Sequence, residues 1–265
     1  MLSKLKITFC FFLFPLLLKS QCLSKITSFK EGEKVSYQIY YNWGFIWVAA
    51  GEAIFTTEKT TFATRPVYKL KGEGRTFPKY DALYKVRDKF ESYVDTANLR
   101  PYRYLRDTKE GSHVVYNDSY FNYTKKRIVG YYKENEKPIK TDTLALHSCV
   151  FDVMSMIYYA RNIDFSKSKI GDKLPIIMYL DNEVHYLYIK YLGKESIKTE
   201  KGMVSCIKFK PKLIPGTMFK DGDEMTVWVS DDENKIPMLI EAPILIGQVK
   251  AVLKSASGTI VPFNL

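Results

Sequence analysis

Apolar and polar residues alternate along most of this chain. In residues 34–40, for example, Val35, Tyr37 and Ile39 fall on one face, as in a strand with one buried side. The same period returns at short intervals between turn-forming residues, so we expect about ten to twelve strands in an antiparallel sandwich or barrel. The predicted strands cover residues 34–40, 45–55, 67–74, 85–94, 101–106, 113–117, 119–124, 127–133, 173–180, 184–191, 203–210, 224–230, 237–241 and 247–254.

One segment departs from this alternation. Residues 148–162 are apolar on nearly every side, with Ser148 as the predicted N-cap and the acid Asp152 near the start. A helix without a polar face is largely buried. The pattern therefore predicts a mainly β fold, a curved antiparallel sheet or barrel-like fold with one largely buried central helix at about 148–162.

A weak repeat lies on the two sides of this predicted helix. Each copy has a strand that ends at Asp, then Asn three residues later and Pro six residues later: Asp95, Asn98 and Pro101 in the first copy, Asp231, Asn234 and Pro237 in the second. Asp and Asn cap tight turns, and Pro is tolerated where a strand begins. The repeat fits two ordinary hairpins or two related halves of one fold, and the sequence leaves both interpretations open.

The N-terminus has the pattern of a secretory signal peptide. Lys4 and Lys6 precede an apolar run at 7–18, and Ser20 ends the segment. We expect residues 1–20 to be the signal peptide, cleaved before Gln21, and residues 21–265 to form a single β-rich domain, because no Gly-, Pro- or Ser-rich linker divides them. The predicted location is therefore outside the cytoplasm, in the periplasm or associated with the outer membrane.

Two alternatives to simple cleavage stay open. Cys22 follows the apolar run closely and could carry a lipid, although Lys19-Ser20-Gln21 fits poorly with the small residues that a lipoprotein signal has before its cysteine. The apolar run could also stay in place as an anchor, although it is shorter than the roughly 20 residues of a membrane-spanning helix.

The charge of the chain excludes one class of partner. The net charge of +11 becomes about +8 when Lys4, Lys6 and Lys19 leave with the signal peptide. The other lysines are scattered and form no arginine-rich stripe, so we expect no nucleic-acid partner. They fit a solvated basic surface, or weak attraction to anionic lipid or glycan.

The residues that usually carry catalysis or metal binding are sparse. No nucleophile elbow, zinc-binding helix, phosphate loop or dinucleotide fingerprint occurs, and the three histidines lie far apart in the sequence. We therefore expect no catalytic residues, no metal and no cofactor. Cys149 and Cys206 could form a disulfide in an oxidising compartment or remain buried free thiols.

Six residues are candidates for ligand binding. Trp43, Phe45 and Trp47 surround a predicted turn, where exposed aromatic side chains can contact a ligand or a membrane. Arg87 and Asp88 lie in an otherwise apolar strand, as a structural ion pair or as the polar element of a cavity. Asp152 has the same two interpretations, as part of a structural ion pair or as a polar group of a cavity. A cation such as Arg87 would compensate its buried charge.

Several motifs resemble one known family over about residues 29–255. They are Phe29-Lys-Glu-Gly32-Glu33-Lys-Val-Ser-Tyr37, Tyr84-Lys-Val-Arg87-Asp88-Lys-Phe90, Asp152-Val-Met-Ser155-Met-Ile-Tyr158-Tyr159-Ala-Arg161, Gly171-Asp172, Val227-Trp228-Val-Ser230-Asp231-Asp232, Ile236-Pro237 and Gly247-Gln-Val-Lys-Ala-Val-Leu253. Together they are similar to domain of unknown function 3108. The resemblance implies an exported, β-rich envelope protein of Gram-negative bacteria with no established activity, and it supplies no catalytic residues.

The favoured function is non-catalytic. We expect an envelope protein that holds a lipid or another apolar or amphipathic ligand in the hollow of its curved sheet, with peripheral membrane contact or an envelope protein as partner. One alternative is an envelope glycan hydrolase that uses paired carboxylates such as Asp88 and Asp152. Another is a structural partner of an outer-membrane assembly.

Overall fold

The computed structural model describes residues 25–43, 46–147, 149–200, 202–214, 225–244 and 247–263. In these residues the chain forms fifteen strands and a single α-helix, together with one short 3-10 helix at Pro78–Tyr80. The strands are β1 (Lys34–Trp43), β2 (Ile46–Phe62), β3 (Arg65–Thr76), β4 (Val86–Asp95), β5 (Pro101–Glu110), β6 (His113–Asn122), β7 (Arg127–Glu134), β8 (Lys140–Ala145), β9 (Val150–Phe151), β10 (Lys173–Leu180), β11 (Glu183–Thr199), β12 (Gly202–Pro211), β13 (Thr226–Ser230), β14 (Pro237–Pro243) and β15 (Gln248–Ser257).

All of these strands belong to one sheet. Its order is β8-β7-β6-β5-β4-β3-β2-β1-β15-β14-β13-β12-β11-β10-β9, so most neighbours are joined by short hairpins. The first and last strands, β1 and β15, pair antiparallel in the middle of this order and join the two runs of hairpins. The short strand β9 is parallel to β10, whereas the other pairs are antiparallel.

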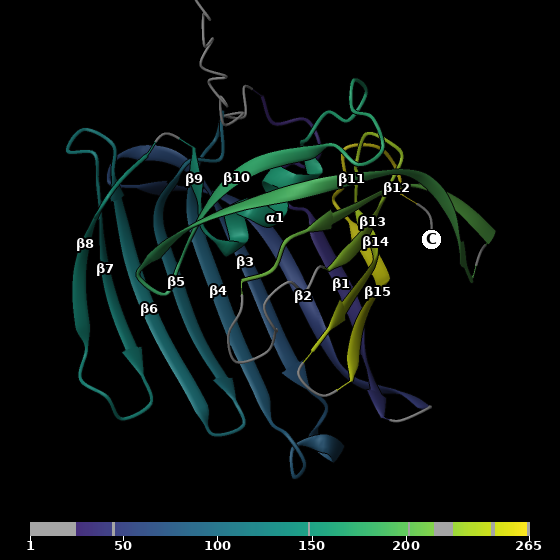
Figure 1. The fold of residues 1–265 in the computed structure, drawn as a ribbon, viewed down its shortest axis with the longest axis horizontal. Coiled ribbons are helices and arrows are strands. Elements are labelled where there is room, and N and C mark those ends of the chain that lie inside the picture. The colour runs from purple at the N-terminus through teal and green to yellow at the C-terminus, as the bar shows by residue number, and fades with distance from the viewer. Residues whose placement is uncertain are drawn as a thin grey trace, which may run out of the picture.

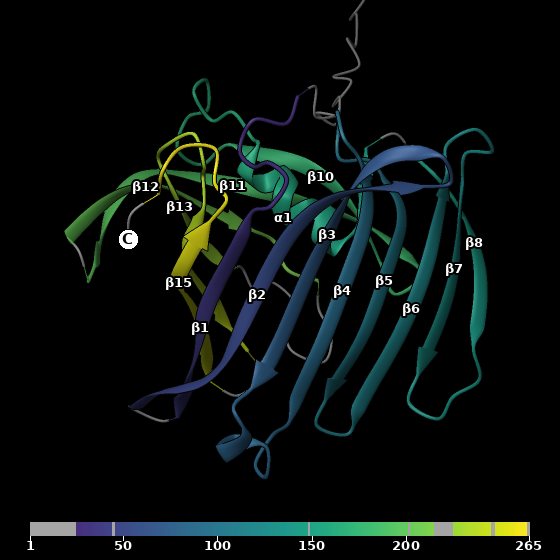
Figure 2. The ribbon, with the colours of Figure 1, turned by 180° about the vertical axis from the view of Figure 1, so that it is seen from behind.

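The sheet is strongly curved, and the helix lies on its concave side. Strands β1–β8 form a long curved wall, and β10 and β11 cross in front of it (Figure 1). The view from behind shows α1 (Val153–Arg161) between the wall and the crossing strands (Figure 2). The helix contacts β3, β4, β9 and β10. The predicted mainly β, barrel-like fold with one largely buried helix is thereby confirmed.

The helix begins later than the sequence pattern predicts. Val150 and Phe151 form β9, where they pair with β10, and the N-cap is Asp152. The Asp152 carboxylate accepts the N–H of Ser155 at 2.9 Å, while the Ser155 hydroxyl oxygen accepts the N–H of Asp152 at 2.9 Å. This reciprocal capping box fixes the helix start. The predicted cap, Ser148, lies outside the described residues.

A glycine allows the helix to lie directly against the wall. A Cβ on Gly72 of β3 would lie 3.0 Å from the sulfur of Met154 on α1, closer than side chains normally approach. Met154 is fully buried, in a cluster with Phe151, Tyr158 and Tyr159. The contact also identifies the side of β3 that carries Gly72 as the inner face of the wall.

The turn between β10 and β11 docks onto the far end of the wall. The Tyr179 hydroxyl lies 2.7 Å from the Ser119 hydroxyl of β6 and donates to the Asn182 side-chain oxygen at 2.6 Å. The Asn182 amide donates to the carbonyl of Gly130 on β7 at 3.3 Å and to Asp142 of β8 at 3.0 Å. Side-chain hydrogen bonds, rather than a backbone ladder, therefore join the β10–β11 hairpin to strands β6–β8.

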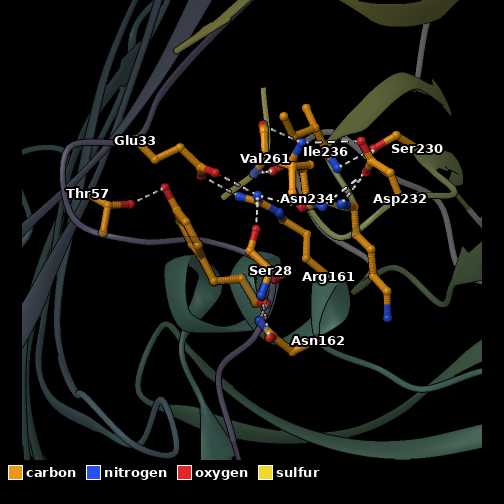
Figure 3. Close-up of polar contacts among 12 residues, drawn as sticks. Ser28, Glu33, Thr57, Arg161, Asn162, Ser230, Asp232, Asn234, Ile236 and Val261 are labelled. Atoms are coloured by element: carbon orange, nitrogen blue, oxygen red, sulfur yellow. Dashed lines mark hydrogen bonds and ion pairs between the residues drawn. The ribbon is translucent and has the colours of Figure 1, made fainter. Parts of the chain in front are cut away.

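A buried ion pair fixes the other end of the helix, and we call it the buried clamp (Figure 3). Arg161 donates to both carboxylate oxygens of Glu33, at 2.6 and 2.8 Å, and to the carbonyls of Ser28 and Asn234, at 2.7 and 2.9 Å. The Arg161 side chain is 4% exposed and that of Glu33 is 0% exposed. The buried clamp thus ties α1 to the start of β1 and to the turn between β13 and β14.

Both copies of the sequence repeat form hairpins, β4–β5 and β13–β14. In the first turn, Asp95 accepts the N–H groups of Ala97 and Asn98. In the second turn the equivalent acceptor is Asp232 rather than Asp231, because Asp231 instead forms an ion pair with Lys194 at 2.6 Å. The repeat therefore marks turns of similar construction.

The two cysteines considered for a disulfide are not bonded to each other. Cys206 is a free, fully buried thiol on β12 that packs with Trp228 and Met238. Cys149 is disulfide-bonded and belongs to the separate core cluster around α1. The two residues lie in different cores, which explains why the Cys149–Cys206 disulfide does not form.

Candidate functional site

The inner face of the wall changes from apolar to polar along its width. Because side chains alternate between the two faces of a strand, residues in register with Gly72 share its inward direction. We call this set the central row; from β1 to β8 it consists of Val35, Phe55, Gly72, Phe90, Arg106, Asn117, Tyr132 and Lys140. The row is apolar on β1–β4 and polar on β5–β8.

The apolar half of the row remains partly accessible. Phe55 and Phe90 are half-buried and pack against the main core. The neighbouring inner row has the small residues Ala53 and Gly74 in register, and a Cβ on Gly74 would meet its nearest atom only at 3.8 Å. A methyl-sized group therefore fits at Gly74, and both phenylalanines keep part of their surface exposed.

Asp88 follows Gly74 in the same neighbouring row. Its carboxylate accepts the N–H of Lys109 at 3.2 Å. Burial and the nearby carboxylate of Glu110 raise the pKa of Asp88 to about 7, although Arg106 opposes the shift. At neutral pH the group is therefore divided between its acid and carboxylate forms, and it can donate or accept a hydrogen bond.

The polar half of the row carries an ion pair. Arg106 donates to both carboxylate oxygens of Asp181, at 2.9 and 3.1 Å, which connects β5 to the β10–β11 turn. Tyr132 lies two strands further along the row, and burial together with the carboxylates of Asp181 and Glu134 raises its pKa. These side chains make the far end of the inner face a polar surface.

A pocket opens at this polar end, with a volume of about 360 Å³. Three elements contribute to it: the inner faces of β7 and β8, the β10–β11 hairpin, and the residues that follow β12. It is lined by Tyr132, Lys140, Asp142, Leu180, Asp181, Asn182, Glu183, His185 and Ile214. The central row thus runs from an apolar region beside α1 to a polar pocket.

The structure assigns Asp152 to the helix cap and not to the inner surface. It is fully buried and accepts hydrogen bonds from the Ser92 hydroxyl at 2.6 Å and from the Ser155 N–H. Burial raises its pKa to about 6. Hydrogen bonds at the helix start therefore satisfy its carboxylate, rather than a cation such as Arg87. Its burial also removes it from the carboxylate pair, Asp88 and Asp152, suggested for a hydrolase.

Arg87 and Asp88 do not form an ion pair with each other. They are successive residues of β4 and so point to opposite faces of the sheet. Arg87 pairs with Asp81 and donates to the carbonyl of Thr76. The suggested pairing of Arg87 with Asp152 is therefore wrong, whereas Asp88 does lie on the inner face.

The aromatic turn is only partly described. Trp47 is half-buried, with the ammonium of Lys250 positioned 4.3 Å from its ring centroid. The backbone of Trp43 belongs to β1, but its side chain and the whole of Phe45 lie outside the described residues. The role of these three residues in binding stays a prediction.

Sequence reasoning missed most of the polar end. Arg106, Tyr132, Lys140 and Asp181 are each unremarkable in their own strand or turn. The one signal was the charged residue Arg106 at an inward position. Arg106 lies two residues after Tyr104 on β5 and therefore shares its face of the sheet. The proximity of the polar-end residues depends on the register of the four strands β5–β8 and on Asp181, in a turn that lies 75 residues after Arg106 in the sequence.

In the described part of the chain, no three or more His, Cys, Asp or Glu side chains converge on a position that could hold a metal ion. None of the described helices has the length and apolar character needed to cross a membrane.

The fold and its inner face together define a β-barrel-like protein whose concave side has an apolar and a polar half. The chain belongs to the family described as protein of unknown function DUF3108, whose model matches residues 36–254. No curated protein matches the chain.

The solved structures that are similar to it include the following two. One is a β-barrel-like protein of domain of unknown function DUF1849 from Brucella abortus, at 12% identity and a TM-score of 0.56, covering 87% of this chain and 98% of that one. The other is a candidate lipoprotein from Parabacteroides distasonis ATCC 8503, at 12% identity and a TM-score of 0.34, covering 89% of this chain and 100% of that one. The first similarity supports the fold, and the second is too low to carry an argument.

Proposed function

We propose that this protein is a non-catalytic binding protein of the cell envelope that holds an amphipathic ligand, such as a lipid, on the concave face of its sheet. The observation that carries the proposal is the central row, in which Phe55 and Phe90 stand at one end and Tyr132 and Lys140 at the other. Ligand sites are typically concave and largely apolar, with a few placed polar groups. A molecule with an apolar chain and a polar head would match both halves of the row.

Phe90 offers the sharpest test of the apolar half. Its half-buried ring would lose its remaining water contact when a ligand binds, and burying a phenylalanine side chain contributes up to about 1.5–3 kcal/mol. We therefore expect Phe90→Ala to weaken binding of a fluorescent acyl-chain probe by about tenfold or more. A matched control is Phe62→Ala, because Phe62 is also half-buried but packs on Tyr93 away from the row.

The measurement is a titration of each purified variant with the probe, together with its thermal unfolding midpoint. An equal loss of affinity in both variants would mean that general destabilisation explains the effect. The absence of acyl-chain binding by the unmodified protein, combined with native mass spectra that show no co-purified lipid, would refute the proposal.

The envelope location is a separate part of the proposal. It is supported by the signal-like segment at residues 1–20. N-terminal sequencing of protein isolated from its native cells should begin at Gln21. A chain that begins at Met1, or a lipid on Cys22, would contradict simple cleavage.

A further inference from the structure

The pocket at the polar end of the central row has the chemistry of a sugar site. We propose that it binds a sugar ring. This inference rests on the proposed function and deepens it, because it names the polar group of the ligand. The sugar could be the head group of a lipid or a free glycan, and the experiment below separates these two sources.

The lining of the pocket mixes donors and acceptors. Lys140 and the Tyr132 hydroxyl can donate, and His185 can do either, while Asp142 and Glu183 can accept. The carboxylates of the pocket would repel an anion, and a simple cation would leave the donors of Lys140 and Tyr132 without a partner. A neutral group with several neighbouring hydroxyls uses both kinds of partner at once.

Two of the three acidic side chains of the pocket, Asp142 and Asp181, are held in place before any ligand arrives. Asp181 is fixed by its two hydrogen bonds from Arg106. One oxygen of Asp142 accepts from Asn182, and Asn182 is itself held by the hydroxyl of Tyr179. Preorganised partners reduce the entropy lost on binding. They suit recognition of a ligand whose hydroxyls have fixed directions, as in a sugar ring.

The pocket also supplies apolar surface and suitable dimensions. The ring of the half-buried Tyr132, together with Leu180 and Ile214, can pack against the C–H face of a sugar. Its volume of about 360 Å³ lies at the lower end of the range for small-molecule sites. These features favour one or two sugar units over a long oligosaccharide.

The test compares ligands that differ only in the polar group. Dodecyl maltoside and tetraethylene glycol dodecyl ether share a chain, both are neutral, and each is titrated below its critical micelle concentration. Maltose alone is the third ligand. We expect dodecyl maltoside to bind about tenfold more tightly than the ether, and maltose to bind weakly at millimolar concentration.

Variants then locate this preference. Tyr132→Leu and the exposed Lys140→Met should each remove most of the tenfold preference, because each lowers the affinity for dodecyl maltoside far more than the affinity for the ether. Tyr131→Leu is the matched control, because Tyr131 is the adjacent residue of β7, points to the opposite face and is 40% exposed. Since Lys140 lies on the exposed edge strand β8, its replacement should leave folding intact, which a thermal midpoint would verify.

Each outcome decides between the two proposals. Equal affinity for the two detergents, or a preference that survives both Tyr132→Leu and Lys140→Met, would overturn the sugar site and leave the proposed function standing. Failure of both detergents to bind would overturn the proposed function. Maltose binding as tight as that of dodecyl maltoside would support the sugar site, identify a free glycan as its source and refute the acyl-chain part of the proposed function.

Discussion

The buried clamp between Glu33 and Arg161 should contribute strongly to stability, and its removal tests how the helix is held. Arg161→Met leaves the carboxylate of Glu33 buried without its cation and deprives the carbonyls of Ser28 and Asn234 of a donor. Glu33→Leu leaves the guanidinium buried without its anion. Both changes replace a charged group with an apolar side chain of related size.

The structure sets the scale of the effect. Removing one partner of a fully buried ion pair costs about 3–5 kcal/mol, because the other charge stays in a low-dielectric environment. For a chain of this size that corresponds to a fall in the melting midpoint of about 6–20 °C. The double variant should cost less than the sum of the two single variants by at least about 2 kcal/mol, since it leaves no unpaired charge.

Urea unfolding followed by tryptophan fluorescence measures these differences, with the buried Trp228 as a probe. Arg75→Met is the control, because Arg75 also pairs with a glutamate but its side chain is 64% exposed. That variant should shift the midpoint far less. Additive effects of the two clamp substitutions, or single variants that unfold like the control, would refute the reasoning.

Three further predictions concern the cap, the docked turn and the free thiol. Asp152→Ala should destabilise the protein by about 1–2 kcal/mol through loss of the helix cap. Burial raises the pKa of Asp152 to about 6, so the folded state binds its proton more tightly than the unfolded state does. The contribution of Asp152 to the free energy of unfolding should therefore fall as the pH rises from about 4 to 6. Asp152→Asn should keep the cap and remove this trend in urea titrations at several pH values. Gly130→Ala should cost about 1–3 kcal/mol because its Cβ would collide with Asn182 and Tyr179, whereas Gly74→Ala has room and should be nearly neutral by the same assay. Burial raises the pKa of Cys206 to about 11, so a thiol reagent should modify this residue only after unfolding, and rapid labelling of the native protein would contradict its placement.

The strand pattern was predictable because most strands bury one face and alternate accordingly. The exceptions have local physical reasons. Residues 113–122 form one strand rather than two, because Asp118 points outward and pairs with Arg103 across the sheet. β8 was missed because it is an exposed edge strand with little apolar character. The fourteen strand ranges expected from the sequence thus lose one by the merger of residues 113–122 and gain the unpredicted β8 and β9. This gives the fifteen strands of the described residues, more than the expected ten to twelve.

The candidate site was harder to predict than the fold. Asp88 was identified, since a charge at an inward position is unusual in its own strand. Asp152 was identified as a buried acid, but its partners are Ser155 in the capping box and the hydroxyl of Ser92 on β4, and not a distant cation. The pocket combines β7 and β8 with the β10–β11 turn, and no local pattern indicates that these segments meet.

The pairing of β1 with β15 has a consequence for how the protein is made. Lys34 lies opposite Ser257, so this ladder joins segments that are synthesised at opposite ends of the chain. Before β15 is synthesised, the side of β1 that pairs with it has unpaired backbone N–H and C=O groups, even though β1–β8 can already form their hairpins. Such an edge can pair with other chains, and contacts between distant segments slow folding. We therefore expect truncation before Gln248 to yield an aggregating product even though β2–β8 keep all their neighbours, so that solubility reports whether β15 is present.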